Sequence, residues 1–256
     1  MSFALEQVPA IALIALLGAL LQGALGFGIA LFALPLMVWV DVPLPVAIAV
    51  VHTTSVGQMG WGCWKYREHI LWKPAAGVNL GRLATLPLGV LTLAYLVSLG
   101  TGPVKLVVGV ALLLAVVIRT VVRVQPREKV RWWWAALAGT TSGYLGGVVG
   151  MSGPPIVLWV TAHNWSTDKT RAMMWSSMLP VTPVIVALMM YKFGMPVVYG
   201  TLLGLALLPL TVMGAMVGTD LGAKLSAHRL RGAALVVLTI IALASVIEPI
   251  LAMRGA

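Results

Sequence analysis

Charge is scarce in this sequence of 256 residues, and acidic charge is the scarcest. Charged residues make up 9% of the chain and only 7 residues are Asp or Glu, whereas a soluble globular domain carries roughly 25% charged residues. The single cysteine, Cys63, excludes an internal disulfide and a cysteine-based zinc or iron–sulfur site. The apolar stretches contain no paired carboxylates, no His/Cys metal set and no plausible Ser-His-Asp arrangement. The sequence therefore predicts neither an enzyme nor a metal or cofactor site.

Apolar residues fill most of the chain. The hydrophobic fraction is 60% and the mean hydropathy is +1.00. Apolar runs long enough for a bilayer recur from end to end, for example around 202–217 and 235–250. This pattern is typical of an all-α integral membrane protein with several spans in the lipid bilayer. The net charge of +10 does not indicate nucleic-acid binding, because the basic residues stand in short loops between apolar stretches.

Six apolar stretches have the length of one membrane crossing. They lie at 43–64, 75–98, 103–122, 172–191, 196–222 and 233–253. Two further regions, 8–40 and 132–162, are too long for one helix across a hydrocarbon core of about 30 Å, and each has a glycine-rich interruption in the middle. We predict that each folds as a pair of short helices that returns to the side it entered from, either as a re-entrant hairpin or as two thin spans.

Basic residues are distributed unequally between the two sides of this arrangement. Thirteen of the 17 fall on one side, Arg82 falls on neither, and the other side receives only Lys105, Lys192 and Arg254. The positive-inside bias makes the richer side cytoplasmic, including the basic linker 123–131. Both termini are then predicted to lie outside, on the periplasmic face.

The two long interrupted regions resemble each other in sequence. At an offset of 120 residues, QGALGFGIALFALPLMVWV at 22–40 aligns without a gap with SGYLGGVVGMSGPPIVLWV at 142–160. Two glycines, a proline and a tryptophan coincide, and the two hairpins face opposite ways. We therefore predict one membrane domain, 1–256, built of two inverted-topology repeats, 1–122 and 132–256. Each repeat is a broken hairpin plus three transmembrane helices, an architecture found in secondary transporters.

The interruptions are candidate binding sites. A helix that begins inside a membrane protein has free N–H groups and a positive dipole end, which favour an anion. Such backbone is tolerated only where protein or a watery cavity surrounds it. The alternative is that these glycines merely allow helices to pack closely. The candidate residues are Gly26, Phe27 and Gly28 in the first half and Gly150, Ser152, Gly153 and Pro154 in the second, with Ser152 as a helix N-cap.

Arg82 is a further candidate because it stands deep in the predicted span 75–98. It lies nine residues beyond Lys73, which is about 13 Å along a helix. Asn79 shares its helix face, and no acidic residue lies deep in any span to neutralise the charge. A buried cation without a partner suits an anionic substrate. The alternative is a structural arginine that snorkels to the surface or binds carbonyl groups.

A polar stretch, HTTS, begins at His52 within the predicted span 43–64. A histidine in the membrane can carry a proton near neutral pH, which makes His52 the candidate for proton coupling. A neutral histidine that hydrogen-bonds two helices is the alternative. Thr53, Thr54 and Ser55, together with Ser176 in the second half, are candidate hydrogen-bond donors to the anion.

The paired glycine motifs resemble the signatures of the TauE/SafE sulfite exporter family. QGALGFGIALFALPL and GTTSGYLGGVVGMSGPP stand near the starts of the two halves, and the likeness in length and layout covers nearly the whole chain. The resemblance implies a small prokaryotic inner-membrane permease for sulfite, related sulfur oxyanions or organosulfonates. Met151 and Ser152 depart from the family pattern, in which a further glycine is often found, and this leaves the identity of the anion open. The motif positions carried over are Gln22, Gly23, Gly26, Phe27, Gly28, Ser142, Gly143, Gly146, Gly147, Gly150, Ser152, Gly153 and Pro154.

The leading hypothesis is a secondary transporter that moves a small sulfur-containing anion by alternating access around the two broken hairpins. Gln22, the two interruptions and Arg82 would hold the anion, and no cofactor is expected. Whether transport is coupled to protons through His52 is left open by this hypothesis. An uncoupled anion channel of the same architecture is the alternative, and a homodimer is left open.

Overall fold

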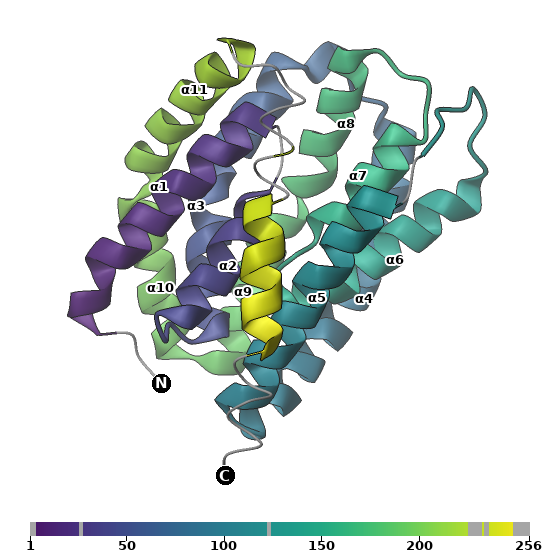
Figure 1. Ribbon diagram of the computed structural model, residues 1–256. Coiled ribbons are helices and arrows are strands. Elements are labelled where there is room, and N and C mark those ends of the chain that lie inside the picture. The colour runs from purple at the N-terminus through teal and green to yellow at the C-terminus, as the bar shows by residue number, and fades with distance from the viewer. Residues whose placement is uncertain (1–3, 26–27, 122–123, 225–231, 233–235, 248–256) are drawn as a thin grey trace.

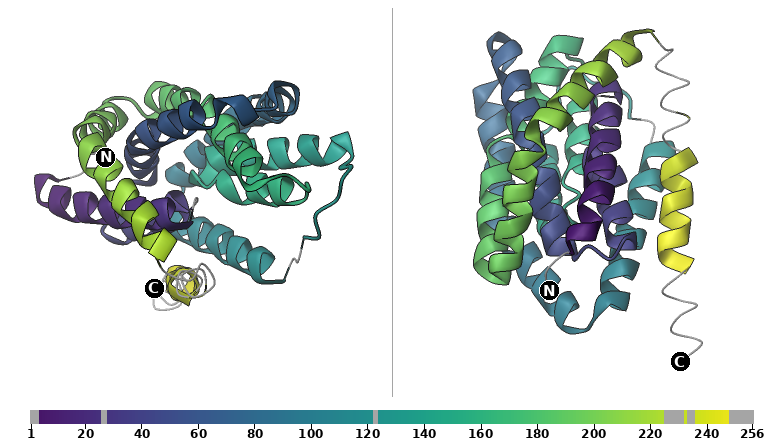
Figure 2. Two further views of the ribbon diagram at one scale, coloured as in Figure 1. Left: turned by 90° about the horizontal axis from the view of Figure 1, so that it is seen from above. Right: turned by 90° about the vertical axis from the view of Figure 1, so that its left-hand side faces the viewer.

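The computed structural model describes residues 4–25, 28–121, 124–224, 232 and 236–247. These residues form a bundle of helices, and no strand occurs among them (Figures 1 and 2). Of the described helices, four are long and apolar enough to cross a membrane. A bent pair, α10 (Met195–Ala206) and α11 (Leu208–Lys224), adds a fifth if it counts as one span. The prediction of an all-helical fold with several helices able to span a membrane is thus confirmed for the described residues.

The first long apolar region folds as two helices, α1 (Val8–Leu25) and α2 (Ile29–Trp39). Gly28 precedes α2 with φ 112°, a conformation that residues with a Cβ rarely adopt. The expectation of two short helices is wrong for the first member. With the 3-10 turn η1 (Leu5–Gln7), α1 is long and apolar enough to cross a membrane alone, and only α2, with 11 residues, is short.

Helix α3 (Leu44–Lys65) lies in the interior of the bundle. Prolines at its start suit the first turn of a helix, where no N–H bond is lost. Every residue from Leu44 to Ser55 is buried, and α2, α9 (Val181–Phe193) and α10 pack against it. The polar stretch that begins at His52 is therefore enclosed by protein.

Helices α4 (Trp72–Ser98) and α5 (Thr101–Val121) complete the first half. They match the predicted spans 75–98 and 103–122 to within a few residues, as α3 matches 43–64. A short 3-10 turn, η2 (Arg67–His69), separates α3 from α4. Pro87 lies inside α4 without ending it.

The second long apolar region also folds as two helices, α6 (Trp132–Val149) and α7 (Gly153–Thr161). Gly150 ends α6 with φ 72°, and its N–H bonds the Gly146 carbonyl at 3.0 Å. The gapless alignment pairs the first break, 26–28, with 146–148, yet α6 continues through these residues and breaks at 150–152. The second break thus coincides with the interruption that the sequence predicts at Gly150–Pro154, although it lies four residues, about one helical turn, later than the gapless alignment alone would place it.

Two predicted spans are each built of two helices, although the first pair, Thr167–Phe193, still counts as one stretch long and apolar enough to cross a membrane. Residues 172–191 fall in α8 (Thr167–Met178) and α9, and 196–222 fall in α10 and α11, which are bent by 52°. Prolines explain both interruptions, since Pro180 caps α9 and Pro209 lies in the first turn of α11. A proline lacks an N–H and its ring clashes with the preceding turn. The last described helix, Val236–Ile247, lies within the predicted span 233–253.

The two most extensive helix interfaces each join one half of the chain to the other. Helix α4 packs along α6, and α1 packs along α11 (Figures 1 and 2). A Cβ on Gly89 of α4 would meet the Tyr144 carbonyl of α6, and a Cβ on Gly218 of α11 would meet the Leu20 carbonyl of α1. Glycine thus allows the two backbones to touch in both interfaces.

Basic residues gather at one end of the bundle. In Figure 1, η2, the linker residues 124–131, the start of α8 and the end of α11 lie at the upper end. The turn after α2 and the turn between α4 and α5 lie at the lower end, where Asp41 and Lys105 form an ion pair of 3.4 Å. The arrangement agrees with the one-sided distribution of charge. Which end faces the cytoplasm stays a prediction.

Candidate functional site

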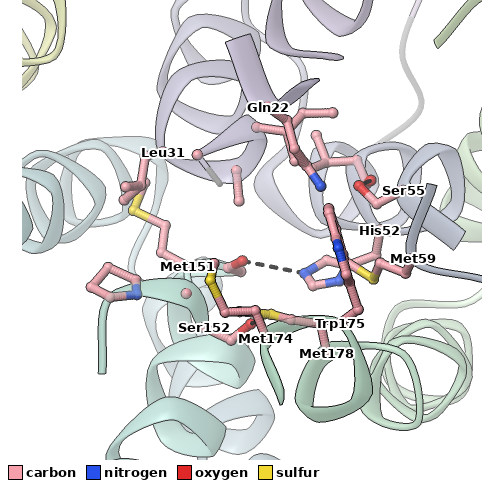
Figure 3. Close-up of a pocket in the computed structure, with 17 residues that line it drawn as sticks. Gln22, Leu31, His52, Ser55, Met59, Met151, Ser152, Met174, Trp175 and Met178 are labelled. Carbon is pink, nitrogen blue, oxygen red and sulfur yellow. Dashed lines mark hydrogen bonds between the residues drawn. The ribbon is translucent and has the colours of Figure 1, made fainter. Parts of the chain in front are cut away.

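A cavity of about 60 Å³ lies where the two helix breaks approach each other (Figure 3). A single water needs about 10–15 Å³ by the same measure, so the cavity has room for a solute of a few non-hydrogen atoms. Its walls come from α1, α2, α3, α8 and the break between α6 and α7. The lining residues are Gln22, Gly28, Ile29, Ala30, Leu31, Val51, His52, Ser55, Met59, Gly150, Met151, Ser152, Gly153, Pro154, Met174, Trp175 and Met178.

Helix α2 begins at this cavity. A Cβ built on Gly28 would have no atom within 4 Å, so the space beside the helix start is open. Ile29, Ala30 and Leu31 line the cavity, and the N–H groups of a helix's first turn have no partner within the helix. These N–H groups and the positive end of the helix dipole favour an anion here. Gly26 and Phe27, which the sequence places at this site, lie outside the described residues.

Helix α7 begins at the same cavity, with Gly153 and Pro154 in the lining. Ser142 of α6 donates its hydroxyl proton to the Ser152 carbonyl at 2.6 Å and so ties the break to α6. Pro154 and Pro155 have no N–H. The start of α7 therefore offers fewer backbone donors than the start of α2.

Ser152 occupies the N-cap position of α7, as predicted, but its side chain makes no capping hydrogen bond. The predicted capping contact is therefore wrong, because the residue has a helical backbone conformation, with φ −79° and ψ −10°. An N-cap side chain needs an extended backbone to turn back onto the first N–H groups. The nearest partner of its hydroxyl is the Met178 sulfur at 4.0 Å, a weak contact.

His52 reaches the second break from α3. Its Nε2 lies 3.2 Å from the Gly150 carbonyl oxygen, and because a carbonyl only accepts, Nε2 carries a proton. The other ring nitrogen, Nδ1, is buried without a partner. A neutral His52 offers a lone pair at Nδ1, whereas a protonated His52 offers a second N–H. Only the charged form can therefore donate from Nδ1 to an anion.

Gln22 and Ser55 lie on the upper side of the cavity in Figure 3. Gln22 is 3% exposed and its Oε1 has no hydrogen-bond partner. Ser55 donates its hydroxyl proton to the Val51 carbonyl at 2.7 Å, which leaves its oxygen only as an acceptor. Gln22 is thus the better placed of the two to donate to a bound anion, through its amide nitrogen.

Arg82 lies close to the cavity but does not line it. Its side chain is buried, and Nε and Nη1 have no hydrogen-bond partner. No carboxylate of the described residues forms an ion pair with it. The charge of Arg82 acts on His52, which lines the cavity, and repels a positive charge on that ring. The guanidinium adds an uncompensated positive charge behind His52, and its burial disagrees with a snorkelling side chain.

Four other predicted ligands stand outside the lining of the cavity. Asn79 donates from Nδ2 to the Ser176 carbonyl at 3.1 Å, and its Oδ1 has no partner. Thr53 faces Gly204 of α10, where an added Cβ would lie 2.8 Å from the Thr53 Cβ. Thr54 and Ser176 donate their hydroxyl protons to carbonyls of their own helices. A direct role for these four residues stays a prediction.

Sequence reasoning missed most of the apolar wall of the cavity. The largest missed side chains are Met59, Met151, Met174, Trp175 and Met178. The segment MMWSSM at 173–178 contains a usable signal, because Met174 and Met178 stand one turn apart and share a helix face. Together with the polar groups, these residues make a small, largely apolar chamber between two helix N-termini. Within the described part of the chain, no group of three or more His, Cys, Asp or Glu residues is placed to hold a metal ion.

Comparison with known proteins shows a likeness to one family. The family model described as Sulfite exporter TauE/SafE matches residues 11–245. A protein of Cupriavidus necator described as a probable sulfite/organosulfonate exporter TauE is 26% identical over 153 residues, 59% of this chain. The match spans 60% of the length of that relative. No solved structure matches the chain.

Proposed function

The chain belongs to the TauE/SafE sulfite exporter family, and on this premise we propose that it is a secondary transporter for a small sulfur-containing anion. Sulfite and small organosulfonates are the expected substrates, in line with the description of the Cupriavidus relative. The observation that carries the proposal is the cavity at the starts of α2 and α7, two helices that begin inside the bundle. Two helix N-termini aimed at one small chamber suit an anion and repel a cation.

Transport by alternating access around the two hairpins is the mechanism we favour. When the halves are matched hairpin to hairpin, α1 corresponds to α6, and the pair α10 and α11 corresponds to α4. The interfaces of α1 with α11 and of α4 with α6 are then equivalent pairs, which supports an inverted repeat. In such an arrangement, rocking of one half against the other exposes the shared cavity to each side in turn.

His52 provides a route to proton coupling. Its Nε2–H is committed to the Gly150 carbonyl, so an anion can receive a hydrogen bond from the ring only when Nδ1 is protonated as well. Binding of the anion and binding of the proton would then favour each other. The proton and the anion would cross together, and the coupled uptake or export would respond to a pH gradient.

The membrane orientation follows from the basic residues. We place the end of the bundle with η2, the linker and the start of α8 in the cytoplasm, and both termini on the opposite face of the inner membrane. A homodimer of the chain stays a prediction.

The test is transport into liposomes that contain the purified protein. Sulfite or methanesulfonate inside the liposomes is measured over time, with and without an inward proton gradient, against empty liposomes. Accumulation above the external concentration supports a coupled transporter. Equilibration without accumulation supports the uncoupled channel instead. If no anion enters, and only a cation or a neutral solute raises the melting temperature of the protein, the anion proposal fails.

A further inference from the structure

The cavity has two chemically different sides. Polar groups come from the first turn of α2, from Gln22 and from His52, whose Nδ1 is buried without a partner. On the opposite side, α8 presents Met174 and Met178 (Figure 3). Gln22 lies above the cavity and the two methionines lie below it in that view.

The methionine side of the cavity cannot satisfy an oxyanion. A thioether has no hydrogen to donate and accepts only weakly, but it is polarizable and packs well against apolar or soft groups. The donors of the described residues near this side are already directed elsewhere. The Ser152 hydroxyl points to the Met178 sulfur at 4.0 Å, and the Thr182 hydroxyl donates to the Met178 carbonyl at 3.1 Å. The N–H edge of the Trp175 indole lies against Gly62 of α3, where an added Cβ would come within 2.7 Å of Nε1. An oxygen turned toward Met174 and Met178 would lose the hydrogen bonds that it makes in water, at a cost of about tenfold or more in affinity.

Sulfur anions differ in whether they have a face without oxygen. Sulfite has three oxygens on one side and a lone pair on the other, methanesulfonate has a methyl group there, and thiosulfate has a terminal sulfur. Sulfate has an oxygen at all four corners. Any orientation of sulfate in this cavity turns at least one oxygen toward the methionine side.

We propose that Met174 and Met178 are specificity-determining residues that admit anions with an oxygen-free face and reject sulfate. This inference rests on the proposed function, because it assumes that the cavity binds a sulfur anion. The three oxygens face the α2 N-terminus, Gln22 and His52, and the oxygen-free face packs on α8. The cavity thereby distinguishes its substrates from sulfate without a dedicated repulsive charge.

Thiosulfate and sulfate form the decisive pair, because both are tetrahedral dianions and differ in one atom. Their dissociation constants for the purified protein are measured by titration calorimetry, with sulfite and methanesulfonate as further ligands. We expect thiosulfate to bind the unaltered protein at least about tenfold more tightly than sulfate.

Two substitutions add to α8 a hydrogen-bond donor for the fourth oxygen of sulfate. Met178→Gln and Met174→Gln each place an amide N–H on the apolar side, and each should tighten sulfate binding until the preference for thiosulfate is largely lost. Met178→Leu keeps the surface apolar and should keep the preference. Met195→Gln makes the same change at an exposed position at the start of α10, outside the lining of the cavity, and should change nothing. If Met178→Gln does not fold, Met174→Gln carries the comparison.

Each outcome decides one question. Equal affinity of the unaltered protein for thiosulfate and sulfate overturns the inference and leaves the proposed function intact. A preference for thiosulfate that survives in the folded glutamine variants overturns the assignment to Met174 and Met178. Failure of all four anions to bind overturns the proposed function itself.

Discussion

Arg82 brings a buried positive charge to the interior without a carboxylate to balance it among the described residues. If this charge serves the anion, Arg82→Gln should weaken sulfite binding by at least about tenfold, since the attraction between the buried charge and the anion is lost in surroundings that screen it little. The melting temperature should stay the same or rise, because an uncompensated buried charge destabilises the fold. Calorimetric titration and a thermal melt of the same sample check both expectations.

The matched control for Arg82 is Arg171→Gln. Arg171 is exposed and donates from Nη1 to the Tyr66 hydroxyl at 3.0 Å. This variant should leave sulfite affinity unchanged. A structural role for Arg82 would give the opposite pattern, with a lower melting temperature and little change in affinity.

His52 should set the pH dependence of transport. Because only a protonated His52 can donate from Nδ1, we expect anion uptake by the unaltered protein to rise as the pH falls. His52→Gln keeps an N–H for the Gly150 carbonyl but cannot titrate, so its uptake should be lower and independent of pH. The initial rate of sulfite uptake is measured across a pH series.

His69 offers the control for this experiment, because it lies exposed in η2. His69→Gln should reproduce the pH profile of the unaltered protein. A His52→Gln variant that retained the full pH dependence would show that another group couples the proton.

At the scale of elements, the contact of α4 with α6 depends on glycine at chosen positions. A Cβ on Gly89 would collide with the Tyr144 carbonyl, whereas a Cβ on Gly77 of the same helix would meet no atom within 4 Å. Gly89→Ala should therefore lower the free energy of unfolding by about 1–3 kcal/mol. Gly77→Ala should leave it unchanged or raise it by about 0.5–1 kcal/mol, because alanine favours a helix.

Unfolding of both alanine variants in detergent, followed by circular dichroism, gives the comparison. Equal effects at Gly77 and Gly89 would mean that helix propensity, rather than close packing against α6, governs this surface.

Prolines show how far the sequence predicts the elements. Pro87 lies within α4 and the helix continues, whereas Pro180 and Pro209 coincide with interruptions. The local signal, a proline in an apolar stretch, is the same in all three cases. The outcome differs because the surrounding helices decide whether the freed backbone groups find other partners. Helices α4 and α5, both long and apolar enough to cross a membrane, were predictable from length and hydropathy alone. The division of the later spans was not.

The polar part of the candidate site was predictable from the sequence, and its apolar part was not. Gly28, Ser152 and His52 stand out as glycine breaks and polar residues in apolar surroundings, and all three line the cavity. Met174 and Met178 line it as well, but an apolar residue in a membrane sequence gives no indication of whether it faces lipid, core or cavity. Only the packing of α8 distinguishes these cases.

For the whole molecule, the orientation in the membrane is testable because the chain has a single cysteine. In a Cys63→Ala background, Ser98→Cys lies at the end of α4 and Lys129→Cys lies in the linker, and both positions are exposed. In intact cells with a permeable outer membrane, an impermeant maleimide should label Ser98→Cys. It should label Lys129→Cys only after the inner membrane is disrupted.

Mass spectrometry of the purified variants measures the labelled fraction. The reverse pattern would invert the orientation that we assign from the basic residues. Labelling of both positions in intact cells would mean that the two ends of the bundle are not on opposite sides of the membrane.

The pairing of α1 with α11 also bears on how the protein is made. Helix α1 leaves the ribosome before the other α-helices described, yet α11, the glycine-lined helix that it packs against, follows only after α10. During synthesis the face of α1 that packs on α11 therefore has no native partner until α11 has been made. Contacts between distant parts of a chain form late and slowly. A chain that stops before α11 therefore leaves α1 without its most extensive interface, a state that quality-control proteases of the membrane can recognise.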